Sequence, residues 1–161
     1  MKKLKIKACK QKYEKSCWAC CSRMVYNFYS GKEVYSNDNE LAKAAGLSVT
    51  DFQNIQTALE KLKIYGGQDG SANIPKLKEI KASIDEDQPL IVCLTSKSVK
   101  FEEDVKGGHY VVISGYDLLN KKLHIVDPHI GIPEWVEFDE KECKLTAYTM
   151  YWGVTYYTEE P

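Results

Sequence analysis

A glutamine that stands six residues before a cysteine is the first indication of chemistry in this sequence. Gln11 precedes Cys17, and Cys17 follows Ser16, a residue type that is favoured as a helix N-cap. Behind Cys17, apolar residues recur at helical spacing as far as Phe28. The thiol would therefore lie in the first turn of a helix, where free backbone N–H groups and the helix dipole stabilise the reactive thiolate. The Gln11 amide and the Cys17 backbone N–H could then form a two-donor oxyanion hole.

The same cysteines also allow simpler interpretations. Cys17 could be one more apolar residue of a buried amphipathic helix, because free cysteine behaves as a small hydrophobic side chain. Cys17 and Cys20 form a C-x-x-C pair, which occurs in thiol oxidoreductases and zinc sites. An oxidoreductase would leave Gln11 without a role, and a zinc site needs a second pair of ligands. We therefore predict no metal and no cofactor, and we expect four of the cysteines to pack in the core: Cys20, Cys21, Cys93 and Cys143.

A cysteine nucleophile needs a neighbouring base, and His109 is the best candidate among the three histidines. It follows Gly107 and Gly108 at the head of an expected strand. Two glycines there would let a substrate backbone approach closely. Gly107, Gly108 and Trp18, which directly follows the nucleophile, are therefore our candidate substrate-binding residues. The alternative is a histidine that only happens to start a strand beside a flexible turn.

Asp127 is the expected partner of His109. It lies at the end of the next strand, directly before Pro128, and faces the same way as buried residues. A carboxylate in that position needs a partner. Antiparallel pairing through the turn at residues 117–122 would bring His109 and Asp127 to the same edge of the sheet. The alternative is a turn-forming aspartate before a proline.

The other two histidines have weaker assignments. His124 points to the face opposite Asp127 and is expected to be a surface or cross-strand residue. His129 lies in a loop and could line a cleft. A metal cluster of His124, Asp127 and His129 is conceivable, but strand alternation separates His124 from the other two.

The whole chain favours an α+β fold in a single domain over residues 1–161. Short apolar segments with helical spacing dominate the first half, and strand-like runs dominate the second. The expected helices cover residues 17–29 and 39–45, a segment capped by Thr50 that runs to Leu62, and a segment that starts at Pro75 and carries Leu77, Ile80 and Ile84. The expected strands cover residues 4–8, 89–95, 110–116, 123–126, 135–138 and 146–157, and residues 66–73 are expected to be a polar loop.

Charge and cysteine usage limit the partners and the location. The formal net charge is −1, which gives no sign of a nucleic-acid or membrane-surface partner. Six cysteines in no regular framework indicate reduced thiols. No secretory signal follows the basic N-terminus, and no apolar run approaches a membrane span. We expect a cytoplasmic protein, although export without a signal would leave no trace in the sequence.

Together these residues resemble the motifs of the papain-like cysteine peptidases. The resemblance rests on Gln11, on Cys17-Trp18-Ala19, on the run from Gly108 to Tyr116, and on Asp127-Pro128. Within that superfamily the compact length and the Gly-His…Asp-Pro pairing are most similar to the bacterial double-glycine leader peptidases (C39-like) and related papain-like effector proteases. The resemblance implies a papain-like fold, with a helical N-terminal half that carries the nucleophile and packs on a C-terminal antiparallel sheet. The residues before Cys17 differ from papain's own signature, so papain's substrate preferences are not implied.

The function expected from these residues is a thiol hydrolase, most simply a cysteine peptidase that acts on a peptide or protein through an acyl-thioester on Cys17. A glutamine deamidase or an acyltransferase would use the same thioester chemistry. A catalytically silent, papain-like binding module is the remaining alternative. The presence of all four of Gln11, Cys17, His109 and Asp127 argues against it.

Overall fold

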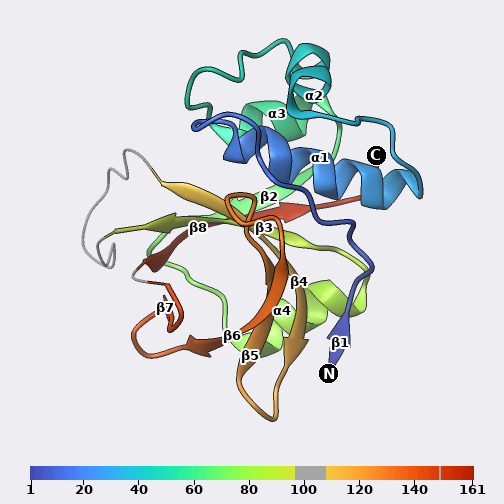
Figure 1. Ribbon diagram of the computed structural model, residues 1–161. Helices are drawn as coiled ribbons and strands as arrows, with labels where there is room; N and C mark the ends of the chain where they lie inside the picture. The colour runs from blue at the N-terminus through green and yellow to red at the C-terminus, as the bar shows by residue number, and fades with distance from the viewer. Residues whose placement is uncertain (97–107, 149) are drawn as a thin grey trace.

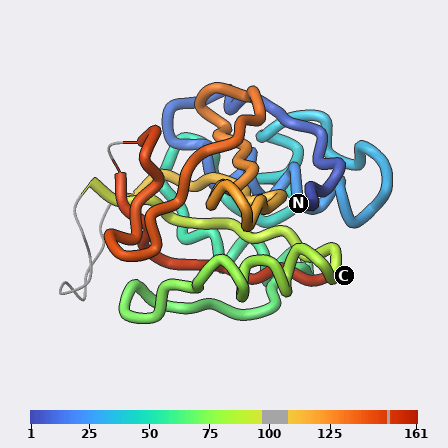
Figure 2. The backbone as a smooth tube through the Cα atoms, turned by 90° about the horizontal axis from the view of Figure 1, so that it is seen from below, coloured from blue at the N-terminus to red at the C-terminus, as the bar shows by residue number. Residues whose placement is uncertain are grey.

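The computed structural model describes residues 1–96, 108–148 and 150–161. Its helices are α1 (Cys17–Ser30), α2 (Asp38–Ala45), α3 (Ile55–Lys61) and α4 (Leu77–Asp85). α1, α2 and α3 lie together on one side of the sheet, and α4 lies apart from them (Figures 1 and 2). None of the described helices is long and apolar enough to cross a membrane.

The strands form a sheet in which every pairing is antiparallel. They pair in the order β1-β4-β3-β8-β7-β6-β5, β2 adds to β8, and β5 also pairs with β4. The circuit from β4 round to β5 therefore closes on itself, as the curved strands of Figure 1 show. The strands are β1 (Lys2–Lys3), β2 (Tyr65–Asp69), β3 (Leu90–Thr95), β4 (His109–Asp117), β5 (Lys122–Val126), β6 (Pro133–Asp139), β7 (Lys144–Leu145) and β8 (Tyr151–Thr158).

Alternation along the strands divides the buried residues into two cores. On β4, Val112 packs in the cluster that contains α1, α2 and α3, whereas Val111 and Ile113 pack in a second cluster with α4. Successive strand residues point to opposite faces, so one strand serves both clusters. The expected combination of helices with an antiparallel sheet is confirmed.

Glycines end the first two helices, as the sequence predicts. Gly31 after α1 has φ 65° and Gly46 after α2 has φ 67°, the left-handed conformation that favours glycine. α1 therefore ends close to the predicted residue. The start of α1 is also at the predicted residue, Cys17.

Several local predictions differ from the structure. α4 begins at Leu77 and not at Pro75, and the last predicted strand, 146–157, is observed as β8 from Tyr151 to Thr158. Ser16 makes no side-chain cap bond, because its oxygen accepts the Tyr13 backbone N–H instead. Asn54, not Thr50, caps α3, so that helix is shorter than predicted. Residues 65–69 form strand β2, although their two glycines predicted a loop; backbone pairing with β8 overrides their low strand propensity. The first strand covers only Lys2–Lys3, with Leu4 bonded through its N–H to the Ser114 carbonyl.

Candidate active site

Cys17 is the first residue of α1, and it is 2 % exposed. The helix packs on β4, the strand that begins at His109. The first backbone N–H groups of a helix have no partner within the helix, and they favour negative charge nearby. The fold thus places this thiol beside the free N–H groups at the start of α1.

His109 and Asp127 meet at one edge of the sheet. Nε2 of His109 lies 2.6 Å from Oδ1 of Asp127, and the two side chains are 22 % and 6 % exposed. The register of β4 on β5 pairs Val112 with Val126. The start of β4 therefore lies beside the residue that follows β5, as the expected hairpin pairing requires.

The charge state of His109 depends on both of its neighbours. Burial lowers its pKa, but hydrogen bonds and charge interactions with Asp127 and Cys17 outweigh burial and raise the pKa to about 9. Because Nε2 faces Asp127, Nδ1 is the ring nitrogen left for Cys17. The imidazole is therefore held between the carboxylate and the thiol, and it stays protonated at neutral pH.

Asp127 has further partners that fix its carboxylate. Oδ1 also accepts the backbone N–H of His129 at 2.8 Å. Burial raises the pKa of Asp127, whereas the bonds from His109, His129 and Tyr148 lower it, and the net result is a pKa below its usual value. Asp127 is thus ionised across the neutral range and can act as the orienting anion. Tyr148 was not predicted from the sequence, because it is more than twenty positions away from Asp127 and carries no motif.

The loop that carries Gln11 is joined to the loop that follows Asp127. The backbone N–H of Gln11 donates to the Pro128 carbonyl at 2.7 Å. A Cβ on Gly131, which has φ 75°, would lie 2.8 Å from the Lys10 Cβ, so the loops touch closely there. The side-chain Nε2 of Gln11 lies 2.8 Å from the Tyr13 carbonyl and 2.9 Å from that of Glu14. In this conformation the amide therefore faces its own loop.

A buried carboxylate that the sequence did not identify supports this loop and the start of α1. Asp38, in the first turn of α2, accepts the Lys12 backbone N–H at 3.0 Å and the Ser16 hydroxyl at 2.8 Å. Its other oxygen lies 3.1 Å from the Arg23 guanidinium, within ion-pair distance but without a well-directed hydrogen bond. Acidic residues are common in the first turn of exposed helices. Nothing in the sequence distinguished this one.

The predicted substrate-binding residues are only partly placed as expected. Trp18 is fully buried and its indole N–H donates to the Asp51 carbonyl, so it packs in the core and presents no surface to a substrate. A Cβ on Gly108 would lie 2.2 Å from the Cys93 sulfur, so its missing side chain makes room for β3. Gly107 lies outside the described residues.

A pocket adjoins the candidate site through Gly108, the residue before His109. It has a volume of about 310 Å³ and combines aromatic, amide and apolar side chains. Cys93 in its wall is close enough to Cys17 for the charge of Cys17 to raise the Cys93 pKa, after burial, which is the larger cause. The lining residues are Phe52, Gln53, Asn54, Cys93, Gly108, Tyr110, Val154 and Tyr156.

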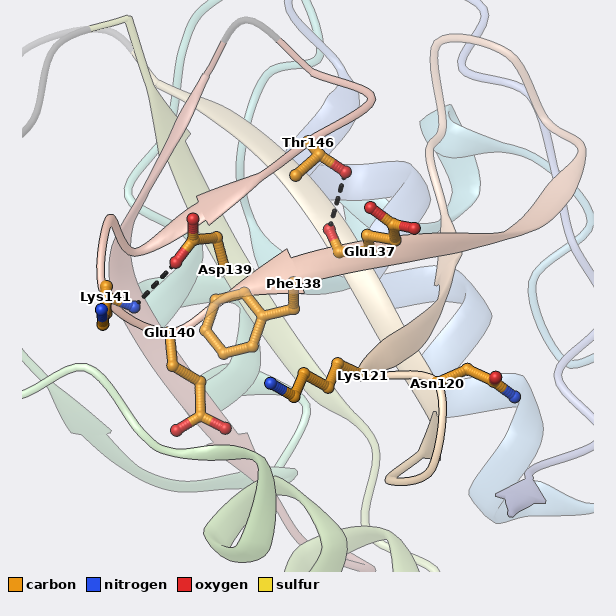
Figure 3. Close-up of a pocket in the computed structure, with 8 residues that line it drawn as sticks. All are labelled: Asn120, Lys121, Glu137, Phe138, Asp139, Glu140, Lys141 and Thr146. Carbon is orange, nitrogen blue, oxygen red and sulfur yellow. Dashed lines mark hydrogen bonds between the residues drawn. The ribbon is translucent and has the colours of Figure 1, made fainter.

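A larger hollow, of about 590 Å³, lies at the other end of the sheet (Figure 3). It surrounds Phe138 near the start of β5, where Lys122 pairs with Glu137, whereas Asp127 follows the end of β5. Charged side chains of both signs line it, and among the described residues its lining includes neither cysteine nor histidine. It therefore has no part in the chemistry described above.

The remaining histidines do not form a metal site. His124 is buried, with Nδ1 2.7 Å from the Ser114 hydroxyl and its ring against Trp135, so it is a buried cross-strand residue and not a surface one. His129 is exposed, and its ring lies edge-on to His109 at 6.5 Å between centroids. Within the described residues, no group of three or more histidine, cysteine or acidic side chains is placed to hold a metal ion.

Comparisons with known proteins agree on one family. Residues 3–158 match the model of the "Peptidase_C39 like family". A crystal structure of a presumed C39-like peptidase from Bacillus anthracis has a TM-score of 0.58 and 13% sequence identity, over 100% of each chain, so it shows similarity of fold. No curated protein sequence matches the chain. The resemblance to C39-like peptidases is thus confirmed. Because the family match spans nearly the whole sequence, the protein belongs to the C39-like peptidase family.

Proposed function

We propose that the protein is a cysteine peptidase with a papain-like catalytic triad of Cys17, His109 and Asp127. The observation that carries the proposal is the imidazole of His109, which lies 2.6 Å from Asp127 and close enough to Cys17 for that side chain to raise the His109 pKa. A thiol at a helix start, a protonated imidazole beside it and an anion behind the imidazole are the parts that thioester chemistry needs. Family membership supports a peptidase.

In the proposed mechanism each group has its own step. The Cys17 thiolate attacks the carbonyl carbon of the scissile peptide bond, and the carbonyl oxygen becomes negative. His109 then gives the proton on Nδ1 to the leaving amine, and an acyl-thioester remains on Cys17. Neutral His109 takes a proton from water, the water oxygen attacks the thioester, and Cys17 leaves as the thiolate. Asp127 holds the ring in the orientation that both transfers require.

The oxyanion would accept hydrogen bonds from the Cys17 backbone N–H and the Gln11 amide. The carbonyls of Tyr13 and Glu14 belong to adjacent residues, and two carbonyls can share one hydrogen in a three-centre bond. The second amide hydrogen of Gln11 is then available to the substrate. Catalytic hydrogen bonds are often poorly aligned before a substrate binds.

The pocket beside Gly108 is the proposed place for a substrate side chain. A peptide whose scissile carbonyl lies over Cys17 runs past His109, and the pocket opens directly beside that residue. Its rings and amides would contact an uncharged side chain, because none of the described residues that line it is charged. The proposed substrate is therefore a peptide or an unfolded protein segment.

Intact-mass analysis of candidate substrates tests the reaction type. Cleavage splits the substrate chain in two, deamidation replaces a side-chain amide –NH2 group by –OH, and acyl transfer adds the mass of the acceptor. We expect cleavage that is absent with the Cys17→Ala variant. A mass change without cleavage, dependent on Cys17, would replace the peptidase by a deamidase or an acyltransferase.

Replacement of Asp127 should separate orientation from folding. Asp127→Ala removes the partner of His109 and should lower kcat/KM roughly 10²-fold, which corresponds to about 2.7 kcal/mol of transition-state stabilisation. Asp127→Asn retains a side-chain oxygen for the ring and should keep much of the activity. Asp117→Ala, at the far end of β4, is the matched control and should change turnover little. If Asp117→Ala were the more damaging change in folded protein, the triad would be wrong.

The raised pKa of His109 predicts where activity is lost at high pH. The imidazolium is the acid that protonates the leaving amine, so kcat/KM should fall as His109 loses its proton, at a pH of about 9. Asp127 is one cause that raises this pKa. In Asp127→Asn the pKa is therefore lower, and the alkaline limb should move to lower pH. A pH profile of kcat/KM measures both values, and an unmoved limb in the variant would contradict the coupling.

A further inference from the structure

Two cysteines outside the proposed triad face each other across the start of the nucleophile helix. The sulfur of Cys9 lies 3.6 Å from the Cys20 carbonyl oxygen, and the sulfur of Cys20 lies 3.4 Å from the Cys9 carbonyl oxygen. These reciprocal contacts hold the two residues side by side, and both are free thiols. Cys20 is fully buried on α1, one turn beyond Cys17, whereas Cys9 is only partly buried.

The surroundings make the two thiols chemically different. Arg23, one turn further along α1, has Nη2 4.0 Å from the Cys20 sulfur. The hydrogen bond from Cys20 and the charge of Arg23 lower the pKa of Cys9, although burial opposes them. The bond to Cys9 and burial raise the pKa of Cys20. The surroundings thus favour ionisation at Cys9, the less buried thiol, over ionisation at Cys20.

A small hollow lies beside Cys9, the less buried of the two thiols. Its volume is about 20 Å³, and both Cys9 and Arg23 line it. A space of about that size holds a single molecule as small as water. Hydrogen peroxide is of similar size, whereas a peptide or glutathione disulfide is far larger.

We propose that Cys9 and Cys20 are a redox modification site, at which hydrogen peroxide converts the two thiols to a disulfide in the folded protein. The proposal rests on the reciprocal placement of the two residues, the neighbouring guanidinium and the small hollow beside Cys9. It is independent of the peptidase proposal. It also differs from the C-x-x-C interpretation, because the partner of Cys20 is Cys9 and not Cys17.

The chemistry proceeds in two balanced steps. The Cys9 thiolate attacks one peroxide oxygen, the O–O bond breaks, and the hydroxide that leaves takes up a proton to become water. Cys9 is then a sulfenic acid. The Cys20 sulfur attacks the Cys9 sulfur, and the sulfenic hydroxyl leaves with the Cys20 proton as a second water. The two thiols lose two electrons, and the peroxide gains them.

The disulfide would close a loop that contains Gln11 and Cys17. Cross-linking Cys9 to Cys20 restrains the unfolded chain, and the native contacts already hold the two residues together. The oxidised protein should therefore unfold at a higher temperature, by roughly 5 °C or more.

Peroxide treatment of the whole chain followed by peptide mapping tests the proposal. A Cys17→Ser background removes the proposed nucleophile, and alkylation blocks the thiols that remain. Trypsin should give residues 8–10 linked to residues 16–23, and fragmentation should place the bond at Cys20. Dithiothreitol should restore both thiols as it becomes a cyclic disulfide. A Cys9 that forms only sulfinic acid, or that links to Cys21, would overturn the proposal.

Matched variants and the unmodified chain complete the test. Cys9→Ser and Cys20→Ser should each abolish the linked peptide, whereas Cys143→Ser should leave it unchanged. The same mapping on the chain with all its cysteines keeps the test valid if a variant fails to fold. In that unmodified chain, a link between Cys9 and Cys17 would also overturn the proposal. A linked protein that unfolds at a lower temperature than the reduced one would show that the bond does not fit the native fold.

Discussion

Replacement of Cys17 by alanine is expected to lower kcat/KM by roughly 10⁶-fold, the size of effect that loss of the nucleophile has on turnover in a serine hydrolase. In the proposed mechanism the thiol forms the acyl intermediate, so His109 and Asp127 have no nucleophile to assist without it. Cys17 is almost fully buried, but alanine differs from cysteine by a single sulfur atom, so the substitution leaves little empty volume and the fold should persist. The measurement is hydrolysis of a peptide that the parent protein cleaves.

The control for this prediction is a second cysteine. Cys143 lies just before β7, away from α1, and Cys143→Ala should retain activity close to that of the parent. Equal loss in both variants, or a Cys17→Ala protein that cleaves at the parent rate, would contradict the role of Cys17.

The largest expected effect on stability is at Asp38. Asp38→Ala should lower the free energy of unfolding by roughly 3–5 kcal/mol, because it leaves the buried Arg23 charge without its anion. The side chains of Arg23 and Asp38 are only 9 % and 1 % exposed. The change also removes the acceptor of the Ser16 hydroxyl and the Lys12 backbone N–H. Urea unfolding measures the loss.

An exposed ion pair provides the comparison. Glu33 pairs with Lys7 at 2.9 Å, but these side chains are 43 % and 77 % exposed. Glu33→Ala should therefore change the free energy of unfolding by less than about 1 kcal/mol. Similar effects of Glu33→Ala and Asp38→Ala would show that the Asp38 network does not support the start of α1 as described.

The sequence predicted those parts of the fold that local pattern determines. α1 begins and ends close to the predicted residues because an apolar stripe and a terminal glycine mark it. The hairpin of β4 and β5 follows from strand alternation and a short turn, and its pairing places Asp127 beside His109. These features depend on neighbours in the chain.

Features set by distant contacts were not predictable. β2 contains two glycines and forms a strand because its backbone pairs with that of β8. The buried state of Asp38 depends on Arg23 and on the loop before Cys17, which come from different segments. Trp18 was predicted to contact the substrate because it directly follows Cys17, but its side chain packs in the core. Helical spacing alone does not tell which face is covered.

Selective alkylation tests the central claim most directly. A Cys17 thiolate paired with the His109 imidazolium should react with iodoacetamide, or with an epoxide of the E-64 type, well before the other five cysteines. Both reagents are larger than the hollow of about 20 Å³ beside Cys9, so Cys9 should react slowly with them. Mass spectrometry of the labelled peptides locates the product, and His109→Ala should remove the preference for Cys17. That result would establish the activated thiol. Labelling that is equal at all accessible cysteines, or that persists at Cys17 in His109→Ala, would contradict it.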